Sequence, residues 1–280
     1  MKNKGLIITI IVLLSLLVLG LGAIMVLVIN RGADTFHFSF GGGVSTEKVF
    51  EESYDATKVV RIGAEVDAAD INFIKSNSAE SVSVAIYADE GTTEYVSRLN
   101  GDELEIRTKS QCRFACFNVR SARIEVSLPE EFAGKVSITS DAGDIDFGEF
   151  KNTAIDINTD AGDIKIAAAK DVRVDADAGD VDIVEAQNID ITSDAGDLDI
   201  DYCFGRLALK MDAGDVDINR LALAEDSYIE VGAGDVEIKN VGDVKVDMKG
   251  NVGSYNINGG NPSSEITLSI KNDFGDVDVK

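Results

Sequence analysis

One six-residue phrase returns along the second half of the chain and constrains the fold more than any other feature. It reads aspartate, alanine, glycine and aspartate, then an aliphatic residue and a charged one. Its clear copies are Asp141–Asp146, Asp160–Lys165, Asp177–Asp182, Asp194–Asp199 and Asp212–Asp217, and its weaker copies are Gly232–Glu237 and Asp273–Asp278. From Gly143 to Gly234 the central glycines are separated by 19, 17, 17, 18 and 20 residues. A fixed period near twenty residues is typical of a stacked repeat architecture.

Between the glycines, apolar and polar residues alternate with a period of two. Ile155 and Ile157 alternate with polar neighbours, and Ile164 and Ile166 do the same after Gly162. This is the pattern of strands with one buried face, and a helix would place such residues on different faces. One repeat cannot bury its own aliphatic row, but stacked coils can. The sequence therefore predicts an all-β fold: a two-sided parallel β-solenoid with about 17–20 residues per coil, over residues 140–280.

The Ala-Gly pair in each phrase predicts a corner between two strands. We expect the alanine to lie inside, where the two sheets converge and only a small side chain fits. Glycine supplies the backbone freedom that a bend with positive φ requires. The flanking aspartates can accept hydrogen bonds from backbone N–H groups at the corner, as aspartate does in turns.

The N-terminal residues predict a membrane anchor. Residues 5–29 are almost wholly aliphatic, and 25 residues rise about 37 Å as a helix, enough to cross a bilayer. A cleaved signal peptide is the alternative, but its apolar core is usually about 7–15 residues long. Lys2 and Lys4 precede the span, which favours a cytoplasmic tail at residues 1–4 and an extracytoplasmic C-terminal domain. The predicted localisation is thus the cell membrane, with a single pass.

Two segments lie between the anchor and the regular repeats. Residues 30–57 are predicted to be a stalk or linker, in which Phe36, Phe38 and Phe40 alternate with polar residues around the single histidine, His37. Residues 58–139 predict a less regular β region that caps the solenoid, as end coils need. Within it, Asp67–Ile71 resembles a corner that lacks its glycine.

Composition excludes several functions. The formal net charge of −24 argues against nucleic acid, which binds basic surfaces. Three cysteines, Cys112, Cys116 and Cys203, do not form a disulfide framework, and we expect idle or buried thiols. The chain contains no G-x-S-x-G, H-E-x-x-H or P-loop motif, so no catalytic, cofactor-binding or metal-binding residue is predicted and the chain is not expected to be an enzyme.

The repeat resembles a known family. The strand that ends Leu128-Pro129-Glu130, the segment from Val136 to Ile145 and the repeated Gly-Asp-Ile/Val units are similar to the bacterial "putative adhesin" domain family over roughly residues 59–280. The resemblance implies a β-solenoid that is often tethered to the membrane and associated with envelope-stress systems. It implies no catalytic residue.

The stacked aspartates allow two interpretations. In the first, each carboxylate accepts a backbone N–H at its corner, while water and salt screen the rest. In the second, neighbouring carboxylates such as Asp144, Asp163, Asp180, Asp197 and Asp215 bind Ca²⁺, which prefers several oxygen ligands. Calcium binding would raise the melting temperature of the domain, so a titration separates the two. The first is the prediction and the second its alternative, because aspartate at glycine turns commonly has this structural role.

The functional prediction is a membrane-anchored, extracytoplasmic and non-catalytic module that binds another component of the cell envelope, an unknown protein or surface polymer. Residues 5–29 make the membrane itself a partner. The alternative is an accessory or sensor protein of an envelope-stress system, which would depend on the anchor and on the stalk around Phe36–Phe40.

Overall fold

The computed structural model describes residues 47–89, 91–110 and 122–280. One short 3₁₀ helix, η1, covers Ala56–Lys58. The first strands are β1 (Lys48–Asp55), β2 (Arg61–Lys75), β3 (Ser81–Tyr87), β4 (Thr93–Asn100), β5 (Glu103–Ser110) and β6 (Ala122–Leu128). They are followed by β7 (Lys135–Ala142), β8 (Ile145–Thr159), β9 (Ile164–Ala178), β10 (Val181–Ala195), β11 (Leu198–Cys203), β12 (Leu207–Ala213), β13 (Val216–Leu221) and β14 (Ser227–Ala233). The last are β15 (Val236–Ile238), β16 (Lys245–Val252), β17 (Tyr255–Ile257), β18 (Thr267–Phe274) and β19 (Val277–Val279).

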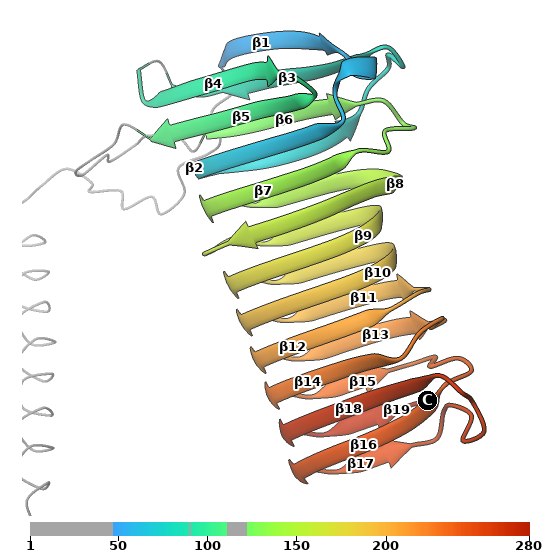
Figure 1. Ribbon diagram of the computed structural model, residues 1–280. Helices are drawn as coiled ribbons and strands as arrows, with labels where there is room; N and C mark the ends of the chain where they lie inside the picture. The colour runs from blue at the N-terminus through green and yellow to red at the C-terminus, as the bar shows by residue number, and fades with distance from the viewer. Residues whose placement is uncertain (1–46, 90, 111–121) are drawn as a thin grey trace, which may run out of the picture. The chain divides into compact units, whose positions relative to one another are not determined.

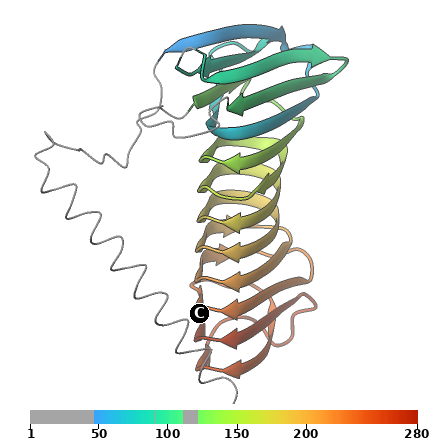
Figure 2. The same ribbon diagram turned by 90° about the vertical axis from the view of Figure 1, so that its left-hand side faces the viewer.

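Parallel strands stack coil upon coil, as the period of the sequence predicts (Figure 1). We name the strand segments that lead into a glycine corner sheet 1, and those that leave it sheet 2. The 15-residue strands β8, β9 and β10 each run along sheet 2, bend, and continue along sheet 1 of the next coil. Equivalent residues pair in register from coil to coil, for example Ile145 with Ile164, and Ile164 with Val181. The fold is therefore a two-sided parallel β-solenoid, seen edge-on in Figure 2.

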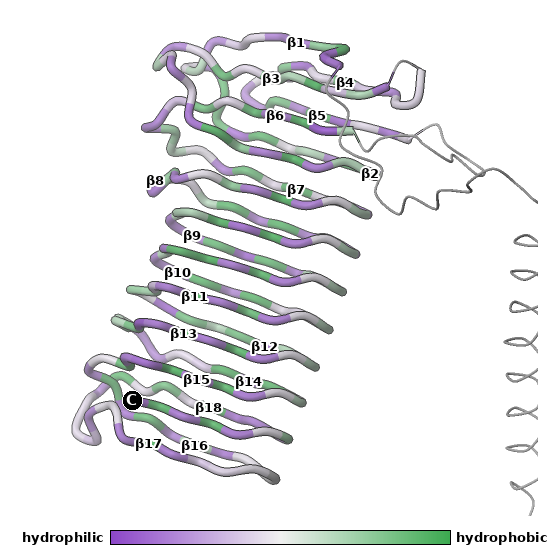
Figure 3. The backbone as a smooth tube through the Cα atoms, turned by 180° about the vertical axis from the view of Figure 1, so that it is seen from behind, coloured by the Kyte–Doolittle hydropathy of each residue, from purple (hydrophilic) through white to green (hydrophobic). Residues whose placement is uncertain are grey.

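A continuous aliphatic core fills the space between the two sheets. The inward row that begins each stretch of sheet 2, such as Ile145, Ile164 and Val181, is buried. Polar residues occupy the outward positions, so that hydrophobic and hydrophilic segments alternate along each strand (Figure 3). Alternate residues of a strand point to opposite faces, which explains why the period of two in the sequence identifies the core.

The order of the coils in space differs from their order in the sequence at both ends of the stack. β2 lies between two later coils, because it pairs with β5 and β6 on one side and with β7 and β8 on the other. At the other end, β18 lies between β14 and β16, and β19 lies between β15 and β17. The first and last coils of the sequence are thus each held between two neighbours.

Antiparallel strands cover the N-terminal end of the stack. β4 pairs antiparallel with β5 on sheet 1, while β3 pairs antiparallel with β6 on sheet 2 and carries β1 at its outer edge. The side chains beneath them, Leu104, Ile106, Ile124 and Val126, are fully buried. Of residues 58–139, expected as a cap, β2, β5 and β6 thus form coils, and only β3 and β4 cover the end. β1 lies within residues 30–57, where a stalk was expected.

The prediction for the corner alanine was wrong. Ala142, Ala161 and Ala178 are exposed, because the chain turns before them and their side chains point away from the core. Phe274 occupies the same register position and is 60 % exposed, so the position does not require a small side chain. The inward position lies two residues earlier, where Ser140, Thr159 and Ala176 are buried.

The predicted anchor at residues 5–29, the tail at residues 1–4 and the aromatic segment Phe36–Phe40 lie outside the described residues. Within the described ranges, no helix is long and apolar enough to span a membrane.

Candidate functional site

A ladder of aspartates runs along the glycine corner from one end of the stack to the other. We name it the inner row, which consists of the aspartate that follows each corner glycine and of Asp70 in the coil formed by β2. Its members are Asp70, Asp144, Asp163, Asp180, Asp197, Asp215, Asp235 and Asp276. In each coil the backbone N–H of the aspartate donates to the carboxylate Oδ1 of the aspartate one coil earlier in the stack, at 2.8–3.1 Å. The last bond comes from the N–H of Ser254 to Asp276 at 2.8 Å.

This ladder confirms that aspartates accept backbone N–H groups at the corner. Each carboxylate of the inner row uses one oxygen on a corner donor that would otherwise lack a partner. Apart from the half-buried Asp70, the aspartates are exposed, so the bond joins consecutive coils at the surface. The corner without glycine at Asp67–Ile71 also takes part, because Asp70 accepts the N–H of Asp144.

Glycine is required at the corners of the regular coils for two reasons. Gly196 has a φ of +133°, a conformation that residues with a side chain rarely adopt, and its N–H bonds the carbonyl of Ala213 at 3.3 Å. A Cβ built on Gly196 would lie 2.1 Å from the carbonyl oxygen of Gly179 in the preceding coil. Backbone therefore stacks directly on backbone along this corner, and any side chain would push the coils apart.

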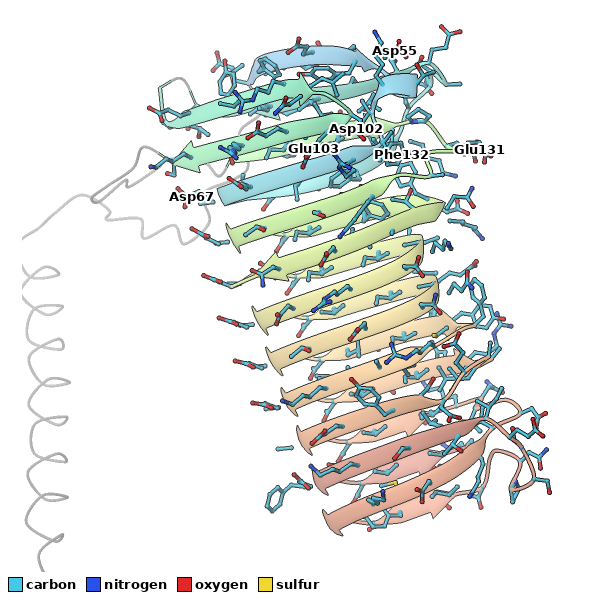
Figure 4. All side chains as sticks on the ribbon, viewed as in Figure 1. Asp55, Asp67, Asp102, Glu103, Glu131 and Phe132 are labelled. Atoms are coloured by element: carbon cyan, nitrogen blue, oxygen red, sulfur yellow. The ribbon has the colours of Figure 1, made fainter. Side chains whose placement is uncertain are left out.

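A second row of aspartates precedes the glycines and has a different role. We name it the outer row: Asp67, Asp141, Asp160, Asp177, Asp194 and Asp212. Figure 4 labels Asp67 at one end of this line of carboxylates. Asp67 accepts the N–H of Ser110 at 2.9 Å, but the other five side chains are exposed and have no hydrogen-bond or ion-pair partner within the described ranges. The predicted corner bond is therefore a property of the inner row only.

A third group of carboxylates lies on the outward face of sheet 2. Asp182, Asp199 and Asp217 are adjacent in register on neighbouring coils. Partial burial raises the pKa of the Asp199 carboxyl, and the nearby charges of Asp217, Asp182 and Asp197 raise it further. Lys239, with its Nζ 3.8 Å from Asp217, offsets this in part. Sheet 2 thus carries more negative charge than its cations neutralise.

The aspartate rows do not converge on a metal site. Among the described residues, no group of three or more His, Cys, Asp or Glu side chains has a geometry that could hold a metal ion. The reason lies in the inner row, where one oxygen of each carboxylate is already used for a backbone bond. The outer row points away from the coils, so consecutive carboxylates do not enclose a common centre.

Surface depressions lie at the covered end, and another of about 400 Å³ lies beside Arg220, Val241 and Lys280 in the C-terminal half of the stack. One at the covered end, about 540 Å³, is lined by residues that include Asp67, Tyr95, Arg107 and Asp141. It is open and lies at the junction of β4 with the first coils. Asp67 and Asp141 of the outer row thus border this depression, and the other aspartates of that row lie outside it.

The described cysteine is buried. Cys203 is fully enclosed, its thiol donates to the carbonyls of Gln187 and Arg206 at 3.6 Å, and burial raises its pKa to about 11. A thiol held in this state is a poor nucleophile. Cys112, Cys116 and His37 lie outside the described residues.

One coil was missed by sequence reasoning. β16 and β17 meet at Gly253, whose φ is +140°, in a corner that lacks the aspartate phrase and reads Asn251-Val252-Gly253-Ser254. A signal for it exists, because Gly234 and Gly275 lie 41 residues apart, about twice the period. The corner lacks the consensus aspartates, so the repeat phrase alone does not reveal this coil.

Fold and corner together define a repeat protein: a parallel β-solenoid with a glycine corner and continuous aspartate rows. The chain belongs to the Toastrack DUF4097 family, whose model matches residues 59–280. The matched range includes both the covered end and the regular coils. No curated protein matches the chain.

Several solved structures are similar in fold. A "putative adhesin" from Parabacteroides distasonis has a TM-score of 0.50 at 11 % identity, over 84 % of this chain and 99 % of that one. A "putative lipid binding protein" from the same organism has a TM-score of 0.48 at 14 % identity, over 85 % and 99 %. A "putative adhesin" from Bacteroides fragilis has a TM-score of 0.42 at 15 % identity, over 85 % and 100 %. At these identities the likeness concerns the fold.

Proposed function

We propose that the chain is a membrane-anchored, non-catalytic interaction module whose solenoid lies outside the cytoplasmic membrane and binds a cationic component of the cell envelope. The observation that carries the proposal is the outer row. Asp141, Asp160, Asp177, Asp194 and Asp212 form a line of exposed carboxylates without partners in the described part of the chain.

Electrostatics explains why such a row favours a cationic partner. Coils stack about 4.8 Å apart, well within the Debye length of about 8 Å at physiological salt. Neighbouring carboxylates of the row therefore repel one another. A basic protein segment or a polymer with regularly spaced cations would relieve this repulsion along several coils at once. Complementary charge also accelerates association and suppresses wrong partners.

The anchor and the orientation rest on the sequence. The apolar run at residues 5–29 follows Lys2 and Lys4, an arrangement that favours a cytoplasmic N-terminus. A tag placed after Lys280 tests this part in whole cells or protoplasts. External protease should remove the tag while the protein stays with the membranes; a protected tag would show that the solenoid faces the cytoplasm, and the proposal would fail.

Binding is tested with the full chain in detergent and a fluorescent oligolysine as the probe. The variant Asp160→Asn, Asp177→Asn, Asp194→Asn removes three charges from the outer row. The matched control Glu80→Gln, Glu225→Gln, Glu265→Gln removes three exposed carboxylates away from the corner. We expect binding that weakens with salt and an affinity reduced about tenfold by the first variant, equivalent to about 1.4 kcal/mol.

The control decides whether the corner or the net charge binds. Both variants change the net charge by the same amount, so an equal loss of affinity in both would show that oligolysine responds to net charge alone. That result, or no binding by the wild type, would contradict the outer row as a binding surface. Envelope fractions fractionated on the immobilised wild-type chain and on the outer-row variant then identify the natural partner.

A further inference from the structure

The C-terminal end of the stack has free strand edges on both sheets. β16 pairs with β18 and β17 pairs with β19, and within the described ranges no other strand pairs with either. The N–H of Lys245 donates to Ile266 on the side of β18. Since successive residues of a strand direct their backbone groups to opposite sides, Val246 and Met248 direct theirs to the free edge. Such edges pair readily with another strand.

Apolar side chains are also uncovered there. Tyr255 and Ile257 occupy the inward positions equivalent to the buried Val277 and Val279, yet they are 41 % and 40 % exposed. Val246 and Met248 on β16 are only partly buried. The core is therefore open at this end. At the opposite end, Leu104 and Ile124 are fully buried beneath β4 and β3, although Tyr95 on the outermost strand β4 is 37 % exposed.

The end coil differs from the other coils in charge. Residues 245–257 contain two lysines and one aspartate, a net charge of +1, whereas residues 188–200 in the middle of the stack contain four aspartates and no basic residue. Ser254 follows the corner glycine where the neighbouring coil has Asp276, and Asn256 pairs in register with Asp278. The inner row thus stops one coil before the free edge.

We propose that this end is the interface of a tail-to-tail dimer, in which β16 and β17 of one copy pair with the same strands of a second copy. A two-fold axis perpendicular to the stack places each strand antiparallel to its own copy. One operation therefore completes both sheets and covers the exposed row of Val246, Met248, Tyr255 and Ile257. Closed two-fold interfaces of this kind are the commonest among homo-oligomers.

Charge allows two copies to meet at this end, because it is less acidic than the rest of the stack. The whole chain carries a net charge of −24, and two acidic coils brought into contact would repel. The end coil replaces the aspartates by serine and asparagine at the interface. On β16 the outward residues are Lys245, Asp247 and Lys249, an order in which an antiparallel copy can place lysine beside aspartate.

The test introduces into the end coil the aspartates that the inner coils carry at the same positions. The variant Ser254→Asp, Asn256→Asp carries residues that neighbouring coils accept at the same register positions, so it should fold. The control Thr139→Asp, Thr192→Asp adds the same charge at exposed outward positions of sheet 1. The mass of the full chain in detergent is measured by light scattering and sedimentation over a range of concentrations and salt.

We expect the wild type and the control to be dimers, and the end-coil variant to dissociate with a dissociation constant raised at least about tenfold. High salt should restore part of the dimer, because added charge causes the dissociation. Met248→Pro, which removes a free-edge N–H without removing a bond to β18, should dissociate it irrespective of salt. A monomeric wild type would overturn the proposal. A dimer that neither the double aspartate variant nor Met248→Pro dissociates would also overturn it, since such a dimer would be held by another part of the chain, such as residues 1–46.

Discussion

The two ends of the solenoid terminate the stack of coils in different ways. At the N-terminal end, antiparallel β3 and β4 cover the last coil, and Leu104 and Ile124 beneath them are fully buried. At the C-terminal end the stack stops at β16 and β17, where Tyr255 and Ile257 remain about 40 % exposed. One end finishes in antiparallel strands, and the other finishes in parallel strands whose corner has no aspartate.

The difference shows which property of a solenoid end is essential. Both ends share the out-of-order threading, in which β2 and the pair β18–β19 are each bonded on both edges by other coils. Chain ends fray unless they are tied down, so this threading protects the first and last repeats regardless of what covers the outermost coil. Val279 on β19 illustrates it, because it lies between β15 and β17 and is fully buried. Covering the core is a separate function, and the two ends differ in the direction of the strands that perform it.

The largest effect is expected from a side chain at a glycine corner. In Gly196→Ala the new Cβ would lie 2.1 Å from a backbone oxygen inside the stack, and in Gly253→Ala 1.8 Å from one at the open end. Both substitutions also impose an unfavourable positive φ, which costs about 1–3 kcal/mol. At position 196 two coils with neighbours on both sides would have to separate, so we expect loss of cooperative folding; at position 253 only the end coil must move.

Circular dichroism and thermal unfolding measure both variants. A folded Gly196→Ala with an unchanged melting temperature would show that the corner tolerates a side chain. Equal losses in the two variants would show that the open end is as constrained as the interior, and the contrast between them would disappear.

A smaller effect is expected from truncating the core at the two ends. Ile124→Ala leaves a cavity under the covering strands, and such changes cost about 2–5 kcal/mol. Ile257→Ala removes a side chain that is 40 % exposed and should cost less than about 1 kcal/mol in the monomer. Denaturant unfolding of both variants gives the two free energies. If the proposed dimer forms, the cost at Ile257 should grow with protein concentration, whereas that at Ile124 should not.

The sequence predicted the repeating part of this fold because every coil obeys the same two rules. The alternation around Ile155 and Ile157 identified the buried face, and the recurrence of Gly143 and its equivalents identified the corner. Bonding of corner N–H groups by aspartate followed from turn chemistry. These inferences depend on local geometry, and the same local pattern occurs in every repeat of the sequence.

The remainder depended on contacts between distant segments. The insertion of β2 between β5 and β7 joins residues that are 42 and 74 positions apart, as in the pairing of Arg61 with Glu103 and Lys135, and no local pattern records it. The exposed alanine was misassigned because the alternation was continued through a bend where it no longer holds. The distinction between inner and outer rows also needed the structure, since both positions carry the same residue.

The smallest effects should appear in pH dependence, with opposite signs at the covered end and along the uncovered stack. At the covered end, Glu105 bonds Arg98 at 2.7 Å and Arg107 at 2.6 Å, which lowers the pKa of its carboxyl from the ordinary 4.5. A lowered pKa stabilises the fold above the unfolded value, and this is lost as pH falls through the folded value. Glu105→Gln should therefore lower the melting temperature at pH 7, and the deficit should vanish in acid.

For Asp199 the sign is reversed. Burial and the neighbouring carboxylates raise its pKa above the ordinary 3.8, so its contribution is most favourable below that value and is lost as pH rises through the folded pKa. Asp199→Asn should raise the melting temperature slightly at pH 7 and have no such effect below about pH 3.8. Parallel melting curves from pH 3 to pH 8 decide the matter. If both variants shifted the melting temperature at pH 7 in the same direction, the contrast would be contradicted. The covered end would then not be stabilised by ion pairs while the stack is destabilised by surplus negative charge.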